Sequence, residues 1–263
     1  MDLGLNGKIA LVTGASSGLG YAVARMLATE GADVAIAARR PDPLHAAAGQ
    51  IRQEAPVRVL PITADVTYPV ACQRVVDTTV AELGGLDILV ANAGGPPTGA
   101  FLELSDEQWQ YANDLNLMST VRLIRAAVPH MQARGDGRIV VIASLSAKQP
   151  LPNLILSNTL RAGILGLTKS LASELAPLGI LVNAALPGWT RTERVDVLLA
   201  DRARRQGITA EEAARAITRD IPLQRMAEPE EFAAAVVFLA SARASYITGV
   251  ALQVDGGQVR SIV

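Results

Sequence analysis

Short β-rich runs alternate with stretches of helical periodicity along the chain, and this alternation restricts the fold more than any other feature. Only 3% of the residues are aromatic, so the core must be mainly aliphatic, as a buried parallel sheet prefers. We therefore expect a doubly wound α/β fold with a seven-stranded parallel sheet covered by helices on both faces. The predicted strands are 9–13, 33–38, 57–62, 86–91, 138–143, 180–186 and 250–254.

The chain of 263 residues fits one α/β domain, and it contains no internal repeat and no interdomain linker. We therefore expect a single domain over 1–263. The one irregular region is 187–224, where Thr209 and Glu212 have the spacing of a capping box and predict short helices. Because this region follows a strand at the sheet edge where α/β proteins bind ligands, we interpret it as a substrate lid. The alternative is a surface helical hairpin without that role.

The charge and composition exclude several classes of partner. With a net charge of −1 and no long basic run, the chain has no visible means of attracting nucleic acid or an anionic membrane. The longest apolar run, 232–240, is far too short to span a membrane, and the start resembles no secretory signal, so we expect a cytoplasmic protein. Cys72, His45 and His130 are too few to predict a metal site.

A glycine-rich turn, TGASSGLG at 13–20, joins the first predicted strand to a helix. Glycines at these positions permit a tight turn, a close approach of the backbone to a pyrophosphate and close helix–strand packing. The helix N-terminus adds unpaired N–H groups and a partial positive charge. We expect the turn to bind phosphates through Gly14, Ser16, Ser17, Gly18, Leu19 and Gly20.

The spacing of these glycines resembles that of the short-chain dehydrogenase/reductase family, and further family motifs follow in order. They are the Asp65 that follows the third strand, the segment 92–94 (NAG), the pair Pro187-Gly188 with Thr192, and 255–257 (DGG). The resemblance covers nearly the whole chain and implies a Rossmann-like fold that binds a nicotinamide dinucleotide. The further cofactor contacts that it implies are Asp65, Val66, Asn92, Ala93, Gly94, Arg161, Pro187, Gly188, Thr190 and Thr192.

The end of the second strand indicates which dinucleotide binds. Sites that prefer NAD usually place a carboxylate there for the ribose 2′-hydroxyl, but this chain has Ala38. The next residues, Arg39 and Arg40, suit the oxygens of a 2′-phosphate. Ser17 stands where many NADP-binding relatives have a second basic residue, and the two arginines could instead only solvate a helix start. We expect NADP(H) in preference to NAD(H).

The resemblance also identifies candidate catalytic residues. Asn116 and Ser144 align with the family's catalytic Asn and with the Ser that hydrogen-bonds the substrate carbonyl. The positions of the family's Tyr-x-x-x-Lys pair carry Ser157 and Arg161 in this chain. The segment that follows stays in step with the family's helix, so the replacement is not a register error. Arg161 can still bind ribose hydroxyls.

This replacement weakens the predicted proton donor. A serine alcohol is a far weaker acid than a phenol, and an arginine does not relay protons as a lysine can. Lys148 is an alternative acid if it is buried beside the cofactor, although an exposed loop lysine is the simpler interpretation. Ser146 and Asn158 could instead orient a water, or simply form loop hydrogen bonds. The sequence predicts a slow or narrowly selective reductase.

The sequence as a whole resembles the β-ketoacyl-acyl-carrier-protein reductase branch of the family. We expect an NADP(H)-dependent oxidoreductase that acts on a small carbonyl or alcohol substrate, such as a 3-oxoacyl thioester. The alternative is a cofactor-binding protein without redox turnover, acting as a sensor or scaffold; no feature favours a lyase or isomerase. Family members commonly form tetramers through helices corresponding to 115–133 and 157–176, so we expect a homotetramer or homodimer.

Overall fold

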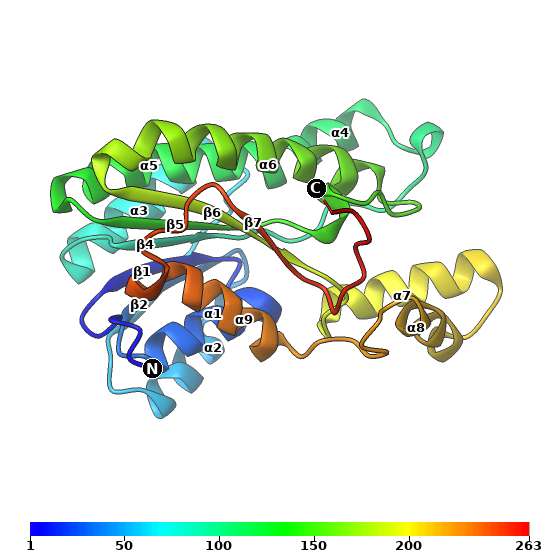
Figure 1. Ribbon diagram of the computed structural model, residues 1–263, viewed down its shortest axis with the longest axis horizontal. Helices are drawn as coiled ribbons and strands as arrows, with labels where there is room; N and C mark the ends of the chain where they lie inside the picture. Colours follow the sequence, from blue (N-terminus) through cyan, green and yellow to red (C-terminus); the bar gives the residue numbers. More distant parts are fainter. Residues whose placement is uncertain (263) are drawn as a thin grey trace.

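The predicted strands form one parallel sheet in the computed structural model, which describes residues 1–262. The strand order is β3-β2-β1-β4-β5-β6-β7, with every neighbouring pair parallel. This arrangement confirms the single doubly wound α/β domain (Figure 1). The strands are β1 (Ile9–Thr13), β2 (Asp33–Ala38), β3 (Val59–Thr63), β4 (Ile88–Ala91), β5 (Gly137–Ile142), β6 (Ile180–Pro187) and β7 (Ala251–Val254).

Several strand boundaries differ from the predicted ones by one or two residues. Strand β3 begins at Val59 rather than at 57 because the backbone N–H of Arg58 donates to the Asp33 carboxylate, at 2.8 Å, and the ladder starts after it. Strand β4 begins at Ile88 rather than at 86, and β5, β6 and β7 shift by one residue at one or both ends. Differences of this size are ordinary at element ends, where local hydrogen bonds compete with the ladder.

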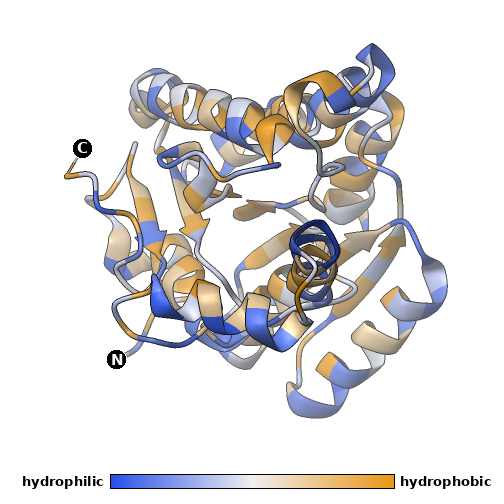
Figure 2. Cartoon of the chain, turned by 90° about the vertical axis from the view of Figure 1, so that its right-hand side faces the viewer, coloured by the Kyte–Doolittle hydropathy of each residue, from blue (hydrophilic) through white to orange (hydrophobic). Residues whose placement is uncertain are grey.

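Helices cover both faces of the sheet, as Figure 1 shows. The helices of one face are α1 (Gly18–Thr29), α2 (Pro41–Glu54) and α9 (Pro229–Ala240), and those of the other are α3 (Pro69–Leu83), α5 (Ser119–Arg134) and α6 (Ile155–Leu175). Helix α6 packs inward through Leu160, Ile164 and Leu175. Each face therefore has its own aliphatic core, and Figure 2 shows the strands lying between the two helical layers.

The irregular region predicted at 187–224 forms two short helices, α7 (Glu193–Gln206) and α8 (Ala210–Arg219). The predicted capping box is confirmed: Thr209 N–H donates to Glu212 Oε2 at 2.8 Å, and Glu212 N–H donates to Thr209 Oγ1 at 3.1 Å. This region is held by a small apolar cluster of its own, made by Val195, Leu199, Ala203, Ala213, Ile217, Ile221 and Met226.

The remaining elements connect the layers. They are η1 (Phe101–Glu103), α4 (Asp106–Asn113), the π-helical turn η2 (Asp114–Met118), and the 3-10 turns η3 (Leu145–Ala147), η4 (Ala176–Leu178) and η5 (Ala242–Ala244). Over residues 1–262, no helix combines the length and the apolar character needed to cross a bilayer.

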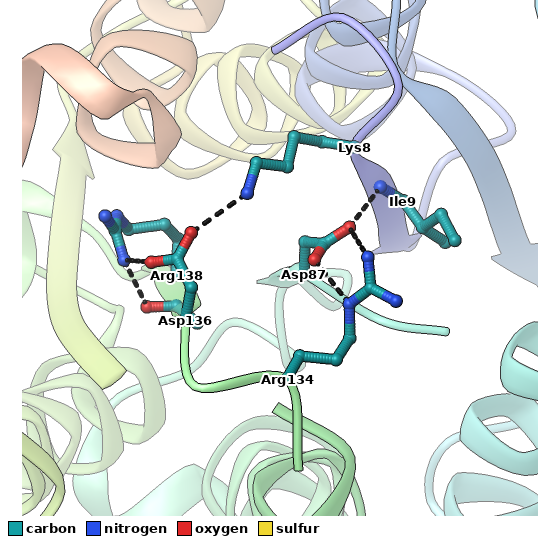
Figure 3. Close-up of polar contacts among 7 residues, drawn as sticks. Lys8, Ile9, Asp87, Arg134, Asp136 and Arg138 are labelled. Atoms are coloured by element: carbon teal, nitrogen blue, oxygen red, sulfur yellow. Dashed lines mark hydrogen bonds and ion pairs between the residues drawn. The ribbon is translucent and has the colours of Figure 1, made fainter. Parts of the chain in front are cut away.

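A buried carboxylate ties the amino ends of the central strands together (Figure 3). Asp87, only 3% exposed, accepts hydrogen bonds from the Ile9 backbone N–H at 2.8 Å and from Arg134 Nε at 2.7 Å. Asp136 forms a second, more exposed pair with Lys8 at 2.9 Å and with Arg138. The Asp87–Arg134 and Asp136–Lys8 contacts join residues that are distant in sequence, and they lie at the sheet edge opposite to the glycine turn.

We expect Asp87→Asn to lower the free energy of unfolding by about 1.5 kcal/mol, because Arg134 loses a charge-assisted hydrogen bond to a buried acceptor. Urea denaturation measures this loss. Asp136→Asn is the matched control, because its exposed ion pairs contribute less than about 1 kcal/mol. If both variants lost the same free energy of unfolding, the burial of Asp87 would not make its contacts more stabilising than those of Asp136.

Candidate active site

The carboxyl ends of β1 and β4 meet where the strand order changes direction, which is where open α/β sheets form their binding crevice. Hydrogen bonds join the two loops there. Thr13 Oγ1 donates to the Asn92 carbonyl at 2.7 Å, and Asn92 N–H donates back to Thr13 Oγ1 at 2.9 Å. Asn92 Nδ2 donates to the Gly14 carbonyl at 3.2 Å. The side chain of Asn92 therefore holds the glycine turn in shape.

The glycine turn is a cradle with no room for a side chain at Gly14 or at Gly20. Gly14 has a φ of +60°, and a Cβ there would lie 2.7 Å from Asn92 Nδ2. A Cβ on Gly20 would lie 2.3 Å from the Gly14 carbonyl oxygen. Helix α1 begins at Gly18 without a side-chain cap from Ser17, so the first-turn N–H groups remain available to an anion. These features fit a dinucleotide diphosphate.

A cavity of about 310 Å³ extends from this cradle along the carboxyl ends of the strands. Most of the site residues predicted from the sequence line it, which places them around one space. They are Gly14, Ser17, Gly18, Leu19, Asn92, Ala93, Gly94, Ser144, Ser157, Arg161, Pro187, Gly188, Thr190 and Thr192.

The other predicted residues lie outside the lining of this cavity. They are Ser16, Gly20, Arg39, Arg40, Asp65, Val66, Asn116 and Lys148.

Four of these residues follow β2 and β3. Arg39 and Arg40 are exposed just beyond β2, and Arg39 Nη1 donates to the Tyr111 hydroxyl at 3.2 Å. Asp65 lies at the end of β3 beside Val66, and its Oδ1 accepts hydrogen bonds from Thr67 N–H and Oγ1 at 3.0 and 2.8 Å. All four lie at the same edge of the sheet as the cradle, on the β2–β3 side.

Asn116 and Lys148 have different surroundings. Asn116 is 2% exposed in the π-helical turn between α4 and α5, and its Nδ2 donates to the Gly94 carbonyl at 3.1 Å. It therefore positions the loop after β4. Lys148 follows η3, and its side chain is not part of the cavity wall. In residues 1–262, no group of three or more His, Cys, Asp or Glu side chains is arranged to hold a metal ion.

Three serines form a chain of hydrogen bonds beside the cavity. Ser146 N–H donates to Ser144 Oγ at 3.1 Å, and the hydroxyls of Ser146 and Ser157 are 3.1 Å apart. Ser144 uses its oxygen as an acceptor in this chain, so its own proton remains available to a carbonyl oxygen in the cavity. Asn158 instead closes the preceding loop, because its amide exchanges hydrogen bonds with the backbone of Leu151 at 3.0 and 3.2 Å.

Arg161 lies one helical turn after Ser157 on α6 and is 8% exposed. Its Nη1 donates to the Ile142 carbonyl and its Nη2 to the Ala93 carbonyl at 3.5 Å, while its buried Nε has no hydrogen-bond partner in the described part of the chain. Burial, and secondarily the charge of Arg194, lowers the pKa of Arg161 to about 10. The guanidinium therefore remains charged at neutral pH.

The structure adds residues that the sequence interpretation missed. Arg194, in the first turn of α7, borders the cavity, and its Nη2 donates to the Pro96 carbonyl at 2.7 Å. Its position had no sequence signal, because it depends on how α7 packs. Trp189 lies within the motif that begins at Pro187, and that proximity could have identified it. The further lining residues are Gly95, Ile142, Ala143, Leu145, Leu151, Leu154, Glu193, Val195 and Leu198.

A second cavity of about 440 Å³ adjoins the first. The two share Leu151, Leu154, Trp189 and Leu198. The second cavity is bounded by the loop before α6, by α7 and α8, and by residues of the C-terminal segment such as Arg260. A molecule longer than one small group can therefore extend from the serines toward the helices of the 187–224 region.

Known proteins resemble this chain over nearly its whole length. A family model described as Enoyl-(Acyl carrier protein) reductase matches residues 14–258. Dehydrogenase/reductase SDR family member 4 from Bos taurus is 38% identical over 97% of this chain and 88% of its own length. The 3-oxoacyl-[acyl-carrier-protein] reductase FabG of Vibrio cholerae is 34% identical over 97% of this chain and 98% of its own.

Solved structures show the same fold. L-sorbose reductase from Gluconobacter frateurii, in complex with NADPH and L-sorbose, superposes with a TM-score of 0.95 at 38% identity, and the match covers 100% of both chains. The F189W variant of actinorhodin polyketide ketoreductase with NADPH gives 0.93 at 35% identity, over 97% of this chain and 98% of that one. Together with the cradle and the loop motifs, these matches show that the chain belongs to the short-chain dehydrogenase/reductase family.

Proposed function

We propose that the protein is an NADP(H)-dependent oxidoreductase that interconverts a carbonyl group and an alcohol on a small molecule. The observation that carries the proposal is one cavity bordered by an uncapped helix N-terminus, by Arg161 and by Ser144. The names of the relatives support it: they are reductases, and one was solved with NADPH and a sugar. In reduction, the carbonyl carbon receives a hydride from the nicotinamide and the oxygen receives a proton, which gives the alcohol.

The cofactor contacts follow from the placement of the loops. The N-terminus of α1 at Gly18 holds the diphosphate, and the segment 92–94 forms the wall beside it. As the family resemblance implies, Asp65 and Val66, just after β3, hold the adenine, and Pro187 and Thr192 hold the nicotinamide end. The further members of this set are Gly14, Ser16, Ser17, Leu19, Gly20, Gly188 and Thr190.

The preference for NADP(H) rests on Arg39 and Arg40, which are exposed at the end of β2 beside the small Ala38. Within residues 1–262 neither guanidinium forms an ion pair with a carboxylate, so both are available to a 2′-phosphate. No carboxylate stands at position 38 to repel that phosphate or to bind a 2′-hydroxyl.

We expect Arg39→Gln combined with Arg40→Gln to lower the ratio of NADPH affinity to NADH affinity about tenfold, the size of one lost charge-assisted hydrogen bond. Titrations that follow nucleotide fluorescence measure both dissociation constants. An unchanged ratio of the two affinities would show that the two arginines do not contact the 2′-phosphate and only solvate the start of α2.

At the reacting end, the Ser144 hydroxyl donates a hydrogen bond to the carbonyl oxygen, and Asn116 holds the loop beside the cofactor through Gly94. Ser157 and Arg161 stand where the family has its tyrosine and lysine. Arg161 stays charged at neutral pH, so we assign to it the binding of ribose hydroxyls and the orientation of the cofactor rather than proton transfer. The alkoxide therefore takes its proton from water held near Ser144 and Ser157, which makes the reaction slow.

The 187–224 region acts as a substrate lid in this proposal. Arg205 of α7 forms a two-pronged ion pair with Glu103 of η1 at 3.2 and 3.1 Å, and Arg194 reaches Pro96. Both contacts join α7 to the segment after β4. The assembly is a homotetramer or homodimer that pairs α5 and α6 with those of another copy.

NADPH consumption by the purified protein against a panel of ketones, aldehydes and 3-oxoacyl thioesters tests the proposed activity. Turnover above the solution rate supports the oxidoreductase. Tight NADPH binding without turnover on any compound would overturn it in favour of a sensor or scaffold. A test of Lys148→Ala completes the comparison, because lost turnover in that variant would identify Lys148, rather than water, as the proton source.

A further inference from the structure

Two arginines from opposite walls border the same cavity. Arg161 enters from α6, and Arg194 enters from the first turn of α7. Each donates to backbone carbonyls, and in residues 1–262 no carboxylate forms an ion pair with either. Among the described residues that line the cavity, the only acidic side chain is that of Glu193, which is exposed. Two arginines and one glutamate leave the wall with a net charge of +1.

The positive charges of these two arginines have no carboxylate partner in the described part of the chain. Arg161 is 8% exposed, and its Nε has no partner in the described part of the chain. Burial lowers the pKa of both guanidiniums, and the charge of Arg194 adds to the effect on Arg161. A buried charge without a counterion is costly, and two like charges facing one space add repulsion. An anion in the cavity would relieve both costs.

The position of Arg161 indicates where that anion lies relative to the reacting group. Its Nη1 is bound to the carbonyl of Ile142, two residues before Ser144, so the guanidinium and the Ser144 hydroxyl lie at the same end of β5. Both arginines and Ser144 border one cavity of about 310 Å³, so an anionic group beside Arg194 and a carbonyl at Ser144 can belong to the same small molecule.

We propose, on the basis of the proposed function, that Arg194, with Arg161 as a second positive charge in the same cavity wall, selects substrates with a carboxylate close to the reacting carbonyl, which makes the preferred substrates oxo acids rather than neutral ketones. Arginine suits this role because its planar fork binds carboxylate oxygens in pairs. The adjoining cavity of about 440 Å³ accommodates the rest of such a molecule.

The cofactor diphosphate is the other possible anion. Arg194 follows Thr192 by two residues, and a Cβ on Gly18 of the cradle would lie 3.4 Å from Thr192 Cγ2. Arg194 is thus near the cradle as well as near Arg161. The two sources differ in what they predict: a diphosphate contact changes nucleotide affinity, whereas a carboxylate contact changes the discrimination between charged and neutral substrates.

Calorimetric titration with acetoacetate and with methyl acetoacetate tests the inference, because the two differ by one negative charge beside the same carbonyl. Each is titrated into the free and the NADP⁺-loaded protein, as wild type, Arg194→Gln, Arg194→Lys and Arg191→Gln. Arg191 is the matched control: it is exposed, pairs with Glu228 and does not border the cavity. Thermal melting establishes that each variant is folded.

We expect wild type and Arg191→Gln to bind acetoacetate about 10- to 100-fold more tightly than the ester, the size of a charge-assisted hydrogen bond. Arg194→Gln should lose most of this ratio, and Arg194→Lys should keep part of it. Two results overturn the inference: a ratio near one in wild type, or an Arg194→Gln variant that binds NADPH more weakly but keeps the ratio.

Failure of the proposed function is a separate result. If the protein binds no NADP(H), the oxidoreductase proposal fails, while the acetoacetate titration of the free protein still decides whether the arginine pair binds a carboxylate.

Discussion

The variant that carries both Ser157→Tyr and Arg161→Lys should reduce a carbonyl substrate about 10²- to 10⁴-fold faster than wild type, the usual contribution of a positioned general acid. Ser157 lies in the first turn of α6 and borders the cavity, so a phenol at this position faces the reacting space. A lysine one turn later on the same face of the helix lowers the pKa of that phenol by its charge. The initial rate of NADPH oxidation at saturating substrate measures the gain.

The pH profile provides a second readout of the same change. A general acid acts only while it is protonated, so kcat of the double variant should fall as the pH rises through the pKa of the new tyrosine. Wild type has no phenol in the cavity wall and should lack this decline. Ser157→Phe with Arg161→Lys is the matched control, because it adds the ring without the hydroxyl. An equal gain in that control would refute the acid–base explanation.

Gly20→Val should weaken NADPH binding on the order of 10- to 100-fold and lower the melting temperature, because overpacking at a rigid site typically costs roughly 1–3 kcal/mol. A Cβ at this position would lie 2.3 Å from the Gly14 carbonyl oxygen and 2.8 Å from Asn92 Nδ2. Backbone is the obstacle at Gly14, so the turn must move and the N–H groups of α1 lose their alignment toward the diphosphate.

Fluorescence titration with NADPH and thermal melting measure the two effects of Gly20→Val. Gly49→Val is the control: Gly49 is also helical, in α2, and a Cβ there meets no atom within 4 Å. Near-normal NADPH affinity in Gly20→Val would mean that the glycine turn does not hold the cofactor, and the proposed function would lose its main support.

Local patterns in the sequence determined the layered fold and the cradle. The alternation of strand and helix patterns predicted the sheet, since each strand signal is contained in a few consecutive residues. The glycines at 14, 18 and 20 are likewise a local signal, because the backbone of the turn in which they lie requires them. The family motifs identified Ser144, Ser157 and Arg161 as members of one site, and the structure places all three around the same cavity.

Only the tertiary structure decided what these residues meet. Arg194 reaches the carbonyl of Pro96, 98 positions earlier in the chain, because the first turn of α7 lies beside the segment after β4, and no local pattern encodes that contact. The 3.1 Å approach of Ser146 to Ser157 likewise requires η3 and α6 to pack together. Sequence periodicity reports which face of an element is buried, whereas the pairing of side chains across a cavity depends on how separate elements pack against one another.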